Sequence, residues 1–179
     1  MNASDVIGFW FEEIDPKQWW KKDPAFDALV RQRFEAIHRA ASRGELFGWR
    51  TTAEGRLAEI IVLDQFSRNM YRDTAQAFAY DALALILAQE AVAHEPAREL
   101  PVGRLAFLFM PFMHSESLLM HEQAVTLFSR PGLEDNLDFE FKHQHIIERF
   151  GRYPHRNAVL GRISTPEEIE FLAQPGSSF

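Results

Sequence analysis

The sequence predicts an all-α protein, folded as one compact domain of seven to nine helices. Apolar residues recur three and four positions apart along most of the chain, which is the period of an amphipathic helix. Residues typical of helix ends stand at the borders of these stretches, and no stretch shows the clean alternation of a strand. A chain of 179 residues, 46% of them hydrophobic, is long enough to bury one such core. We expect a single domain over residues 1–179, ordered from about residue 4 to residue 173.

Residues typical of helix ends define the first two predicted helices. Ser4 precedes an aromatic stretch over residues 6–11, where we expect the first helix. Asp23 followed by Pro24 is typical of an N-cap and a first helical residue, and apolar residues at helical spacing come next. Gly44 follows this stretch, and glycine is favoured just beyond a helix C-terminus, so we expect the second helix to end there.

Three further helices are predicted in the middle of the chain. Thr51 and Glu54 form a capping-box pattern, which opens a helix over residues 55–72. An alanine- and leucine-rich helix follows over residues 81–94. The next helix is very apolar and contains Pro111. Because an internal proline removes one backbone hydrogen bond and clashes with the preceding turn, we expect a break or a kink there.

The last third of the chain is predicted to contain four helices. They are expected over residues 116–128, 138–150, 154–160 and 166–172. Ser115 is a candidate cap for the first of them, and Gly151 ends the second. Thr165, Pro166 and Glu168 form a complete capping signature for the last, with proline at the first helical position and glutamate at the third.

The charge is acidic overall but unevenly distributed. Nineteen Lys and Arg residues stand against 26 Asp and Glu residues, a net charge of −7, which argues against a general nucleic-acid binder. Residues 142–162 nevertheless contain five basic side chains and one acidic one. The chain has no cysteine, so disulfides, thiolate metal sites and cysteine nucleophiles are excluded.

The apolar segments do not predict a membrane protein. The longest unbroken apolar run, Leu105–Met113, has nine residues, whereas a membrane-spanning helix needs about 20. The first residues lack the basic and apolar regions of a signal peptide. We therefore expect a cytoplasmic protein with neither a membrane nor a nucleic acid as partner; the sequence does not predict an oligomeric state.

The first polar cluster lies on the predicted helix 55–72. Asp64 and Arg68 continue its apolar stripe, where a charge must be paired or hydrogen-bonded because isolated burial is costly. They are four residues apart and can pair with each other. Further donors nearby are Gln65, Asn69 and Arg72. Two interpretations stay open: an ion pair that fixes helix packing, or an aspartate that orients an arginine at a cavity.

The second polar cluster follows Pro111 and consists of His114, Ser115 and Glu116. A broken helix exposes backbone donors and acceptors, which is a common way to build a site. His114 and Glu116 could act as an acid–base pair. Equally, Ser115 could be only an N-cap, with Glu116 favoured by the helix dipole.

The third polar cluster extends over residues 143–162. His143 lies on the apolar face of its predicted helix and His145 on the opposite face; a lone core histidine is usually structural. Polar side chains then surround a helix end, a turn and a new helix start: Arg149, Arg152, His155, Arg156 and Asn157. Guanidinium groups match carboxylates and phosphates, and the helix N-terminus favours anions. The alternative is a solvated basic loop.

Long motifs at these clusters carry a resemblance to a known family. They are Phe9–Phe11, Leu63–Arg72, Pro111–Glu116, His143 with Ile146–Ile147, Arg149–Asn157, Leu160–Arg162 and Ser164–Glu168. From about Val6 to Leu172 the chain resembles the bacterial domain of unknown function 924 family. The resemblance implies an all-helical, tetratricopeptide-like fold, and it supplies no activity, substrate or catalytic set. Ser67 replaces the proline associated with that position in the family, which changes the helix locally and removes no charge.

The sequence favours a site for a small anionic ligand, bearing phosphate or carboxylate, in a cleft lined by arginine and histidine. The protein would bind this ligand alone or act on it as a hydrolase or transferase. The candidate acid–base residues are His114, Glu116, His143 and His155. The candidate ligand-binding residues are Asp64, Arg68, Asn69, Arg72, Ser115, Arg149, Arg152, Arg156, Asn157 and Arg162. The alternative is a helical module that binds a peptide or protein, with the polar clusters as buried structural networks.

No cofactor and no metal ion is predicted. The sequence lacks a nucleophile elbow, a P-loop, a dinucleotide fingerprint and a kinase signature. His143 and His145 face opposite sides of a regular helix, so they cannot share one ion.

Overall fold

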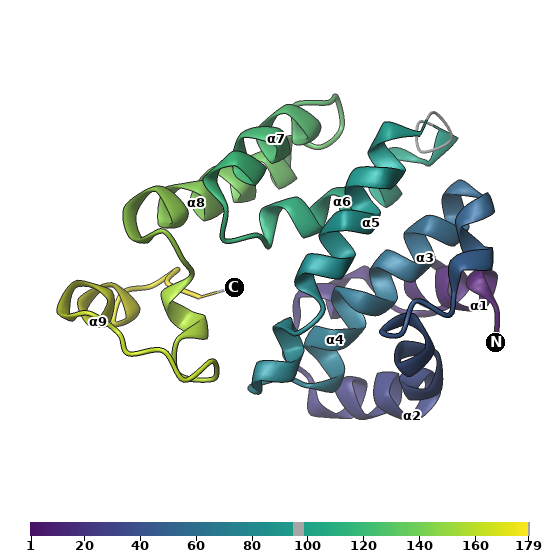
Figure 1. Cartoon of the computed structure of the whole chain (residues 1–179), viewed down its shortest axis with the longest axis horizontal. Helices are drawn as coiled ribbons and strands as arrows, with labels where there is room; N and C mark the ends of the chain where they lie inside the picture. Colours follow the sequence, from purple (N-terminus) through teal and green to yellow (C-terminus); the bar gives the residue numbers. More distant parts are fainter. Residues whose placement is uncertain (95–98, 179) are drawn as a thin grey trace.

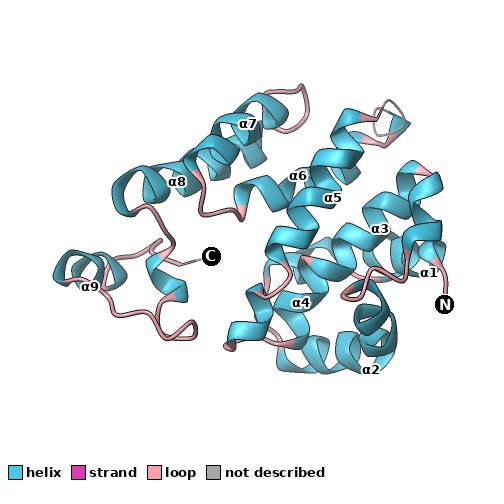
Figure 2. Cartoon of the chain, viewed as in Figure 1, coloured by secondary structure: helices cyan, strands magenta, loops and turns pink. Residues whose placement is uncertain are grey.

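The computed structural model describes residues 1–94 and 99–178, and the regular structure within these ranges is entirely helical (Figure 2). The α-helices are α1 (Ala3–Gly8), α2 (Pro24–Ala41), α3 (Ala53–Leu63), α4 (Gln65–Met70), α5 (Asp81–Ala93), α6 (Val102–Met113), α7 (Leu118–Phe128), α8 (Glu134–Phe150) and α9 (Pro166–Leu172). Shorter helical turns are η1 (Phe9–Glu13), η2 (Pro16–Trp20), η3 (Phe47–Thr51), η4 (Ala75–Phe78) and η6 (Pro154–Arg156). The predicted all-α fold is confirmed.

Two hydrophobic clusters organise the chain. The larger one is built from α1 to α7 and contains buried aromatic side chains such as Trp10, Phe34 and Phe66. The smaller one consists of Ile146, Ile147 and Tyr153, against which Phe150 and Phe171 pack. In Figure 1, α1 to α6 lie together on one side and α7 to α9 on the other. Within the described ranges, no helix combines the length and apolar character needed to cross a bilayer.

Several predicted helix ends are confirmed because they depend on local chemistry. Helix α2 begins after Asp23, whose carboxylate accepts hydrogen bonds from the backbone N–H groups of Ala25 and Phe26. Helix α9 begins with the complete capping box of Thr165 and Glu168. Gly151 ends α8 with a left-handed φ of 67°.

The first helix begins earlier than predicted. Asn2, and not Ser4, is its N-cap: the Asn2 side chain accepts from the N–H of Asp5 at 3.1 Å, and Asp5 accepts from the N–H of Asn2 at 2.6 Å. The first half of the stretch expected to be this helix lies in α1, and its aromatic residues Phe9–Phe11 lie in the wider π-helical turn η1.

The predicted continuous helix over residues 55–72 is wrong. It begins two residues earlier, capped by Thr52 rather than Thr51, and Asp64 divides it into α3 and α4. The hydroxyl of Ser67 donates to the carbonyl oxygen of Leu63 at 2.6 Å, where it competes with the backbone. Such bonds from serine to the preceding turn bend helices, which places the Asp64 carboxylate at a discontinuity.

Of the break or kink predicted at Pro111, the break does not occur. Helix α6 continues through Pro111 to Met113, and the next N–H, that of His114, still bonds to the carbonyl of Met110 at 2.9 Å. Because Pro111 lies near the end of the helix, its missing N–H removes only one bond close to the terminus. Two further helix starts differ from the prediction: α7 follows Ser117 rather than Ser115, and α8 begins at Glu134 rather than at residue 138.

A close backbone approach at Gly55 explains why glycine is needed in the first turn of α3. Thr52 caps this helix by accepting from the N–H of Gly55 at 3.1 Å, which brings the preceding turn against the helix. A Cβ atom at residue 55 would lie 1.9 Å from the carbonyl oxygen of Trp49. Backbone atoms would therefore have to move.

We expect Gly55→Ala to lower the free energy of unfolding by about 1–3 kcal/mol, the usual cost of overpacking. The matched control is Gly103→Ala in α6, where a Cβ atom meets nothing within 4 Å and alanine favours the helix. Urea denaturation of both variants checks this. A Gly55→Ala protein as stable as Gly103→Ala would contradict the close approach.

Candidate functional site

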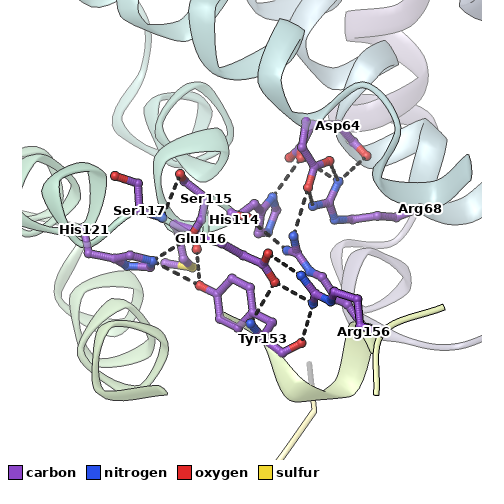
Figure 3. A network of polar contacts seen from close by, with 12 residues as sticks. Asp64, Arg68, His114, Ser115, Glu116, Ser117, His121, Tyr153 and Arg156 are labelled. Atoms are coloured by element: carbon purple, nitrogen blue, oxygen red, sulfur yellow. Dashed lines mark hydrogen bonds and ion pairs between the residues drawn. The ribbon is translucent and has the colours of Figure 1, made fainter. Parts of the chain in front are cut away.

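The three polar clusters predicted from the sequence meet at one place. The junction of α3 and α4 brings Asp64 and Arg68, the turn after α6 brings His114 and Glu116, and η6 brings Arg156 (Figure 3). In Figure 3, Asp64 contacts both His114 and Arg68, and Arg156 approaches the same place from below. We call Asp64, Arg68, Asp81, His114 and Arg156 the central network.

Asp64 is the acceptor at the centre of this network. Its side chain is 1% exposed and lies 2.8 Å from Nδ1 of His114 and 2.7 Å from a terminal nitrogen of Arg68. The side-chain amide of Gln65 donates a further hydrogen bond to the Asp64 carboxylate at 2.7 Å. Burial opposes ionisation of Asp64, but the charge of Arg68 and the contact with His114 outweigh it, so the pKa of Asp64 lies well below its usual range.

His114 is held in one protonation state. Burial and the nearby charge of Arg68 lower its pKa, against the opposing effect of Asp64, so the ring is neutral at pH 7. Because Asp64 is ionised and can only accept, Nδ1 carries the proton and Nε2 the lone pair. Among the described residues Nε2 has no hydrogen-bond partner, and the side chain is 16% exposed. A carboxylate that fixes a neutral imidazole in this way prepares it as a general base.

Arg156 is a buried cation with incomplete compensation. Its guanidinium lies between the rings of Phe78 and Tyr153, 4.5 Å from each centroid. One terminal nitrogen lies 3.2 Å from Asp81 and the other donates to the carbonyl of His114 at 3.0 Å. Its Nε is buried and has no partner among the described residues. Burial, and then repulsion from Arg68, lower the pKa of Arg156.

Asp81 links the two arginines and was not predicted as a site residue. Its carboxylate accepts two hydrogen bonds from Arg68, each 3.0 Å long, and the longer contact from Arg156. One carboxylate therefore serves two guanidinium groups. Arg68 has Asp64 as a second carboxylate partner, and its pKa is raised although burial opposes this. Among the described residues Arg156 has only Asp81 as a carboxylate partner, and its pKa is lowered.

A second ion pair holds the third polar cluster against the turn after α6. Glu116 accepts two hydrogen bonds from Arg162, at 2.6 and 2.9 Å, and one from the backbone N–H of Tyr153 at 2.8 Å. Arg162 also donates to the side-chain oxygen of Asn157 at 2.9 Å. Burial favours the neutral form of Glu116, but these contacts outweigh it and lower the pKa of Glu116. The side chain is therefore a carboxylate at neutral pH, which makes it a poor general acid.

Behind His114 lies a fully buried histidine–glutamate pair that was not predicted. Nδ1 of His121 is 2.6 Å from Glu140, and both side chains are 0% exposed. Nε2 of His121 donates to the carbonyl of Ser115 at 2.8 Å, and the hydroxyl of Tyr153 donates to the carbonyl of Met113 at 2.5 Å. These two carbonyls flank His114, so the pair and Tyr153 fix the backbone that carries it.

Two of the four predicted acid–base residues, His143 and His155, lie against Tyr153. The ring of His143 is 5.8 Å from that of Tyr153 and its Nδ1 donates to the carbonyl of Phe139, while burial lowers its pKa to about 3. The ring of His155 is 5.5 Å from Tyr153, and burial together with Arg156 lowers its pKa to about 4. Both rings are therefore neutral at pH 7.

The remaining predicted ligand-binding residues lie outside the central network. Asn69 and Arg72 both donate to Asp27 of α2, at 2.8 and 2.6 Å. Arg149 pairs with Glu167, and Arg152 with Glu168. The hydroxyl of Ser115 accepts from the N–H of Ser117 at 3.2 Å. These contacts join neighbouring helices and turns.

Some of the missed residues had a signal in the sequence. His121 shares an apolar helix face with Ala124 and Phe128, and Glu140 shares one with His143 and Ile147, so both were polar residues at core positions. Asp81 had no such signal, because an acidic residue at a helix start is ordinarily explained by the helix dipole.

The donor set fits an anion better than a metal ion. Among residues 1–94 and 99–178, no group of three or more His, Asp or Glu side chains is arranged to hold a metal. The guanidinium groups of Arg68 and Arg156 instead offer donors that match carboxylate or phosphate oxygens. The neutral imidazole of His114 contacts Asp64, the partner of Arg68, and could accept a proton from a reacting group.

Comparisons with known proteins agree with the motif resemblance. Residues 6–176 match the model of a family described as bacterial protein of unknown function, DUF924. The chain is also similar to a solved structure, that of the protein of unknown function ATU0120 from Agrobacterium tumefaciens. The two are 40% identical over 96% of each chain, with a TM-score of 0.91. Among curated proteins, no relative was found.

Proposed function

Because the chain belongs to the DUF924 family of bacterial proteins of unknown function, we propose its function from the central network alone. It binds a small anion, bearing phosphate or carboxylate, beside His114 and Arg156. Nε2 of His114 then acts as the general base in a hydrolysis or a group transfer. The predicted cytoplasmic location is compatible with such a metabolite as ligand.

The observation that carries this proposal is the incomplete compensation of Arg156. A buried cation is costly unless it is paired, and Arg156 shares one carboxylate with Arg68. Repulsion between the two arginines lowers the pKa of Arg156, and an added anion would relieve it. An anion that binds here would therefore pair with Arg156, whose charge is only partly compensated by the shared carboxylate of Asp81.

A second reading treats the contacts as a structural clamp, which is how a helical peptide-binding module would use them. It is supported by the ion pairs of Arg68, Arg152 and Arg162, each of which already has a carboxylate partner. In that reading the central network joins α7 to α9 to the rest of the chain and binds no small molecule. The same experiment separates the two.

We expect a screen of phosphorylated and carboxylated metabolites to find compounds that raise the melting temperature. At a concentration about 100 times Kd, the gain is about 2.7 kcal/mol, or about 5–10 °C for a chain of this size. Arg156→Gln should weaken binding at least about tenfold, and Arg156→Lys less, because it keeps the charge. His114→Gln should keep binding and abolish turnover.

The matched control is Arg149→Gln, which removes an arginine from an exposed ion pair of the same cluster. Its affinity for the same compound should equal that of the wild type. Equal affinity in Arg156→Gln would overturn the proposal. So would a screen without a single stabilising anion, and that outcome favours the structural clamp.

A further inference from the structure

We propose that a cavity between α2 and the segment that follows α4 binds a small organic anion that also carries a hydroxyl group. The cavity has a volume of about 320 Å³ and is lined by His38, Arg39, Arg43, Tyr71 and Tyr80 together with Glu35, Ser42 and Gln76. None of these residues belongs to the central network. The proposal does not depend on the function assigned to His114.

Free positive charge lines this cavity. Arg39 and Arg43 form no ion pair with any residue in the described ranges, whereas Arg68, Arg156 and Arg162 each contact a carboxylate. Glu35 is the single carboxylate among the described residues that line the cavity, so the two arginines leave an excess of one positive charge. In a chain with a net charge of −7, this is a local exception.

His38 supplies a hydrogen-bond acceptor at the same place. The residue is 2% exposed, and Nε2 of its ring lies 2.7 Å from the hydroxyl of Ser67. The Ser67 hydroxyl donates its only proton to the carbonyl oxygen of Leu63. It can therefore only accept from His38, so Nε2 of His38 carries the proton. The lone pair of the neutral ring is therefore on Nδ1, which has no hydrogen-bond partner among the described residues.

The surroundings keep this ring neutral and fixed. Burial lowers the pKa of His38, and Glu35 opposes this only in part. The rings of Tyr71 and Tyr80 lie edge-on to it, with centroids 5.3 and 5.2 Å away. A neutral acceptor beside two cations matches a ligand with two features, an anionic group for Arg39 and Arg43 and a hydroxyl that donates to Nδ1.

Carboxylate and phosphate both satisfy the anionic requirement, so the test uses one probe of each kind. Glycerate and glycerol 3-phosphate carry the anion and a hydroxyl, and propionate and methyl phosphate are their counterparts without the alcohol. Isothermal titration calorimetry on the full chain should show binding of at least one hydroxylated probe. We expect it about fivefold tighter than its counterpart, the effect of one hydrogen bond. Whichever hydroxylated probe binds more tightly identifies the anionic group.

The variant Arg39→Gln/Arg43→Gln should weaken that binding at least about tenfold, because it removes both charge-assisted contacts. The matched control, Arg56→Gln/Arg130→Gln, removes the same charge from two arginines that do not line the cavity. Ser67→Ala should keep the affinity for the probe without a hydroxyl and reduce the preference for the hydroxylated one, since Nε2 of His38 loses its acceptor. Arg156→Gln, which weakens anion binding at the central network, should change none of these values.

Three results would overturn the proposal. They are a wild type that binds neither hydroxylated probe, equal losses in the cavity variant and its control pair, and a hydroxyl preference that Ser67→Ala leaves unchanged. Loss of binding in Arg156→Gln is a fourth such result, because the probes would then occupy the central network.

Discussion

We expect Asp64→Asn to lower the free energy of unfolding by about 3–5 kcal/mol, the usual cost of breaking a buried ion pair. Three donors converge on this carboxylate, from Gln65, Arg68 and His114. An amide has one acceptor oxygen, and its NH₂ group would face at least one of these donors. Removing the charge also leaves Arg68 and Arg156 sharing Asp81 without further compensation.

The matched control is Glu13→Gln, which changes a carboxylate to an amide in the exposed ion pair with Arg33. Exposed pairs contribute little, so we expect this variant to differ only slightly from the wild type. Urea denaturation at pH 7 compares the two. If Asp64→Asn were as mild as Glu13→Gln, the buried network would not have the strength assigned to it.

The pH dependence provides a second check on Asp64. Because its pKa is lower in the folded chain than in the unfolded chain, its ionised form stabilises the fold above about pH 4. That contribution decreases as the pH falls below this value. The stability difference between wild type and Asp64→Asn should therefore be largest at neutral pH and shrink in acid.

The second large effect is expected at His121. His121→Ala would leave the Glu140 carboxyl group buried without its partner, since Oε2 of Glu140 already has none among the described residues. We expect a loss of about 3–5 kcal/mol in the free energy of unfolding, measured by urea denaturation at pH 7. Glu140→Gln should be milder, because its amide can donate to Nδ1 of a neutral His121.

The His121–Glu140 pair also predicts that the stability of the fold changes with pH. Nε2–H of His121 donates to Ser115, so the short contact between Nδ1 and Glu140 needs one further proton, wherever it resides. Burial raises the pKa of Glu140, and that of Tyr153 is also raised, so the hydroxyl of Tyr153 stays protonated. In the unfolded chain, a glutamate releases its proton near pH 4.3.

The folded chain therefore keeps the proton of Glu140 to a higher pH than the unfolded chain does. Its stabilisation is complete below about pH 4.3 and decreases as the pH rises through the raised pKa, by up to about 1.4 kcal/mol per pH unit. Glu140→Gln removes this titrating group. Wild type should lose stability relative to Glu140→Gln as the pH rises above about 4.3, and parallel stability curves would contradict this account.

Local signals explain which parts of the fold could be predicted. The N-caps at Asp23 and Thr165 and the glycine at residue 151 act on the adjacent turn, and the helices they bound are confirmed. The division at Asp64 could not be read from helical periodicity, because it coincides with a hydrogen bond from the side chain of Ser67. Likewise, Pro111 does not break α6 because it lies near the end of the helix, and helical periodicity does not show where that end falls.

The candidate site was predictable in its parts and not in its pairings. Polar residues on apolar faces pointed to Asp64, Arg68 and His143 correctly as buried or partly buried side chains. The partner of Arg156, however, is Asp81, which lies 75 residues away in the sequence. Only the packing of η6 against the first half of the chain determines which arginines share a carboxylate.

The protonation state of His114 tests the central claim most directly. Ring ¹⁵N NMR of the wild type, assigned with His114→Gln, reports which nitrogen carries the proton and at which pH the ring becomes charged. The account predicts a neutral ring at pH 7 with the proton on Nδ1, and a pKa below the ordinary value of 6.5. A ring that is charged at pH 7, or a neutral ring with the proton on Nε2, would contradict it, because neither could serve as the base that Asp64 prepares.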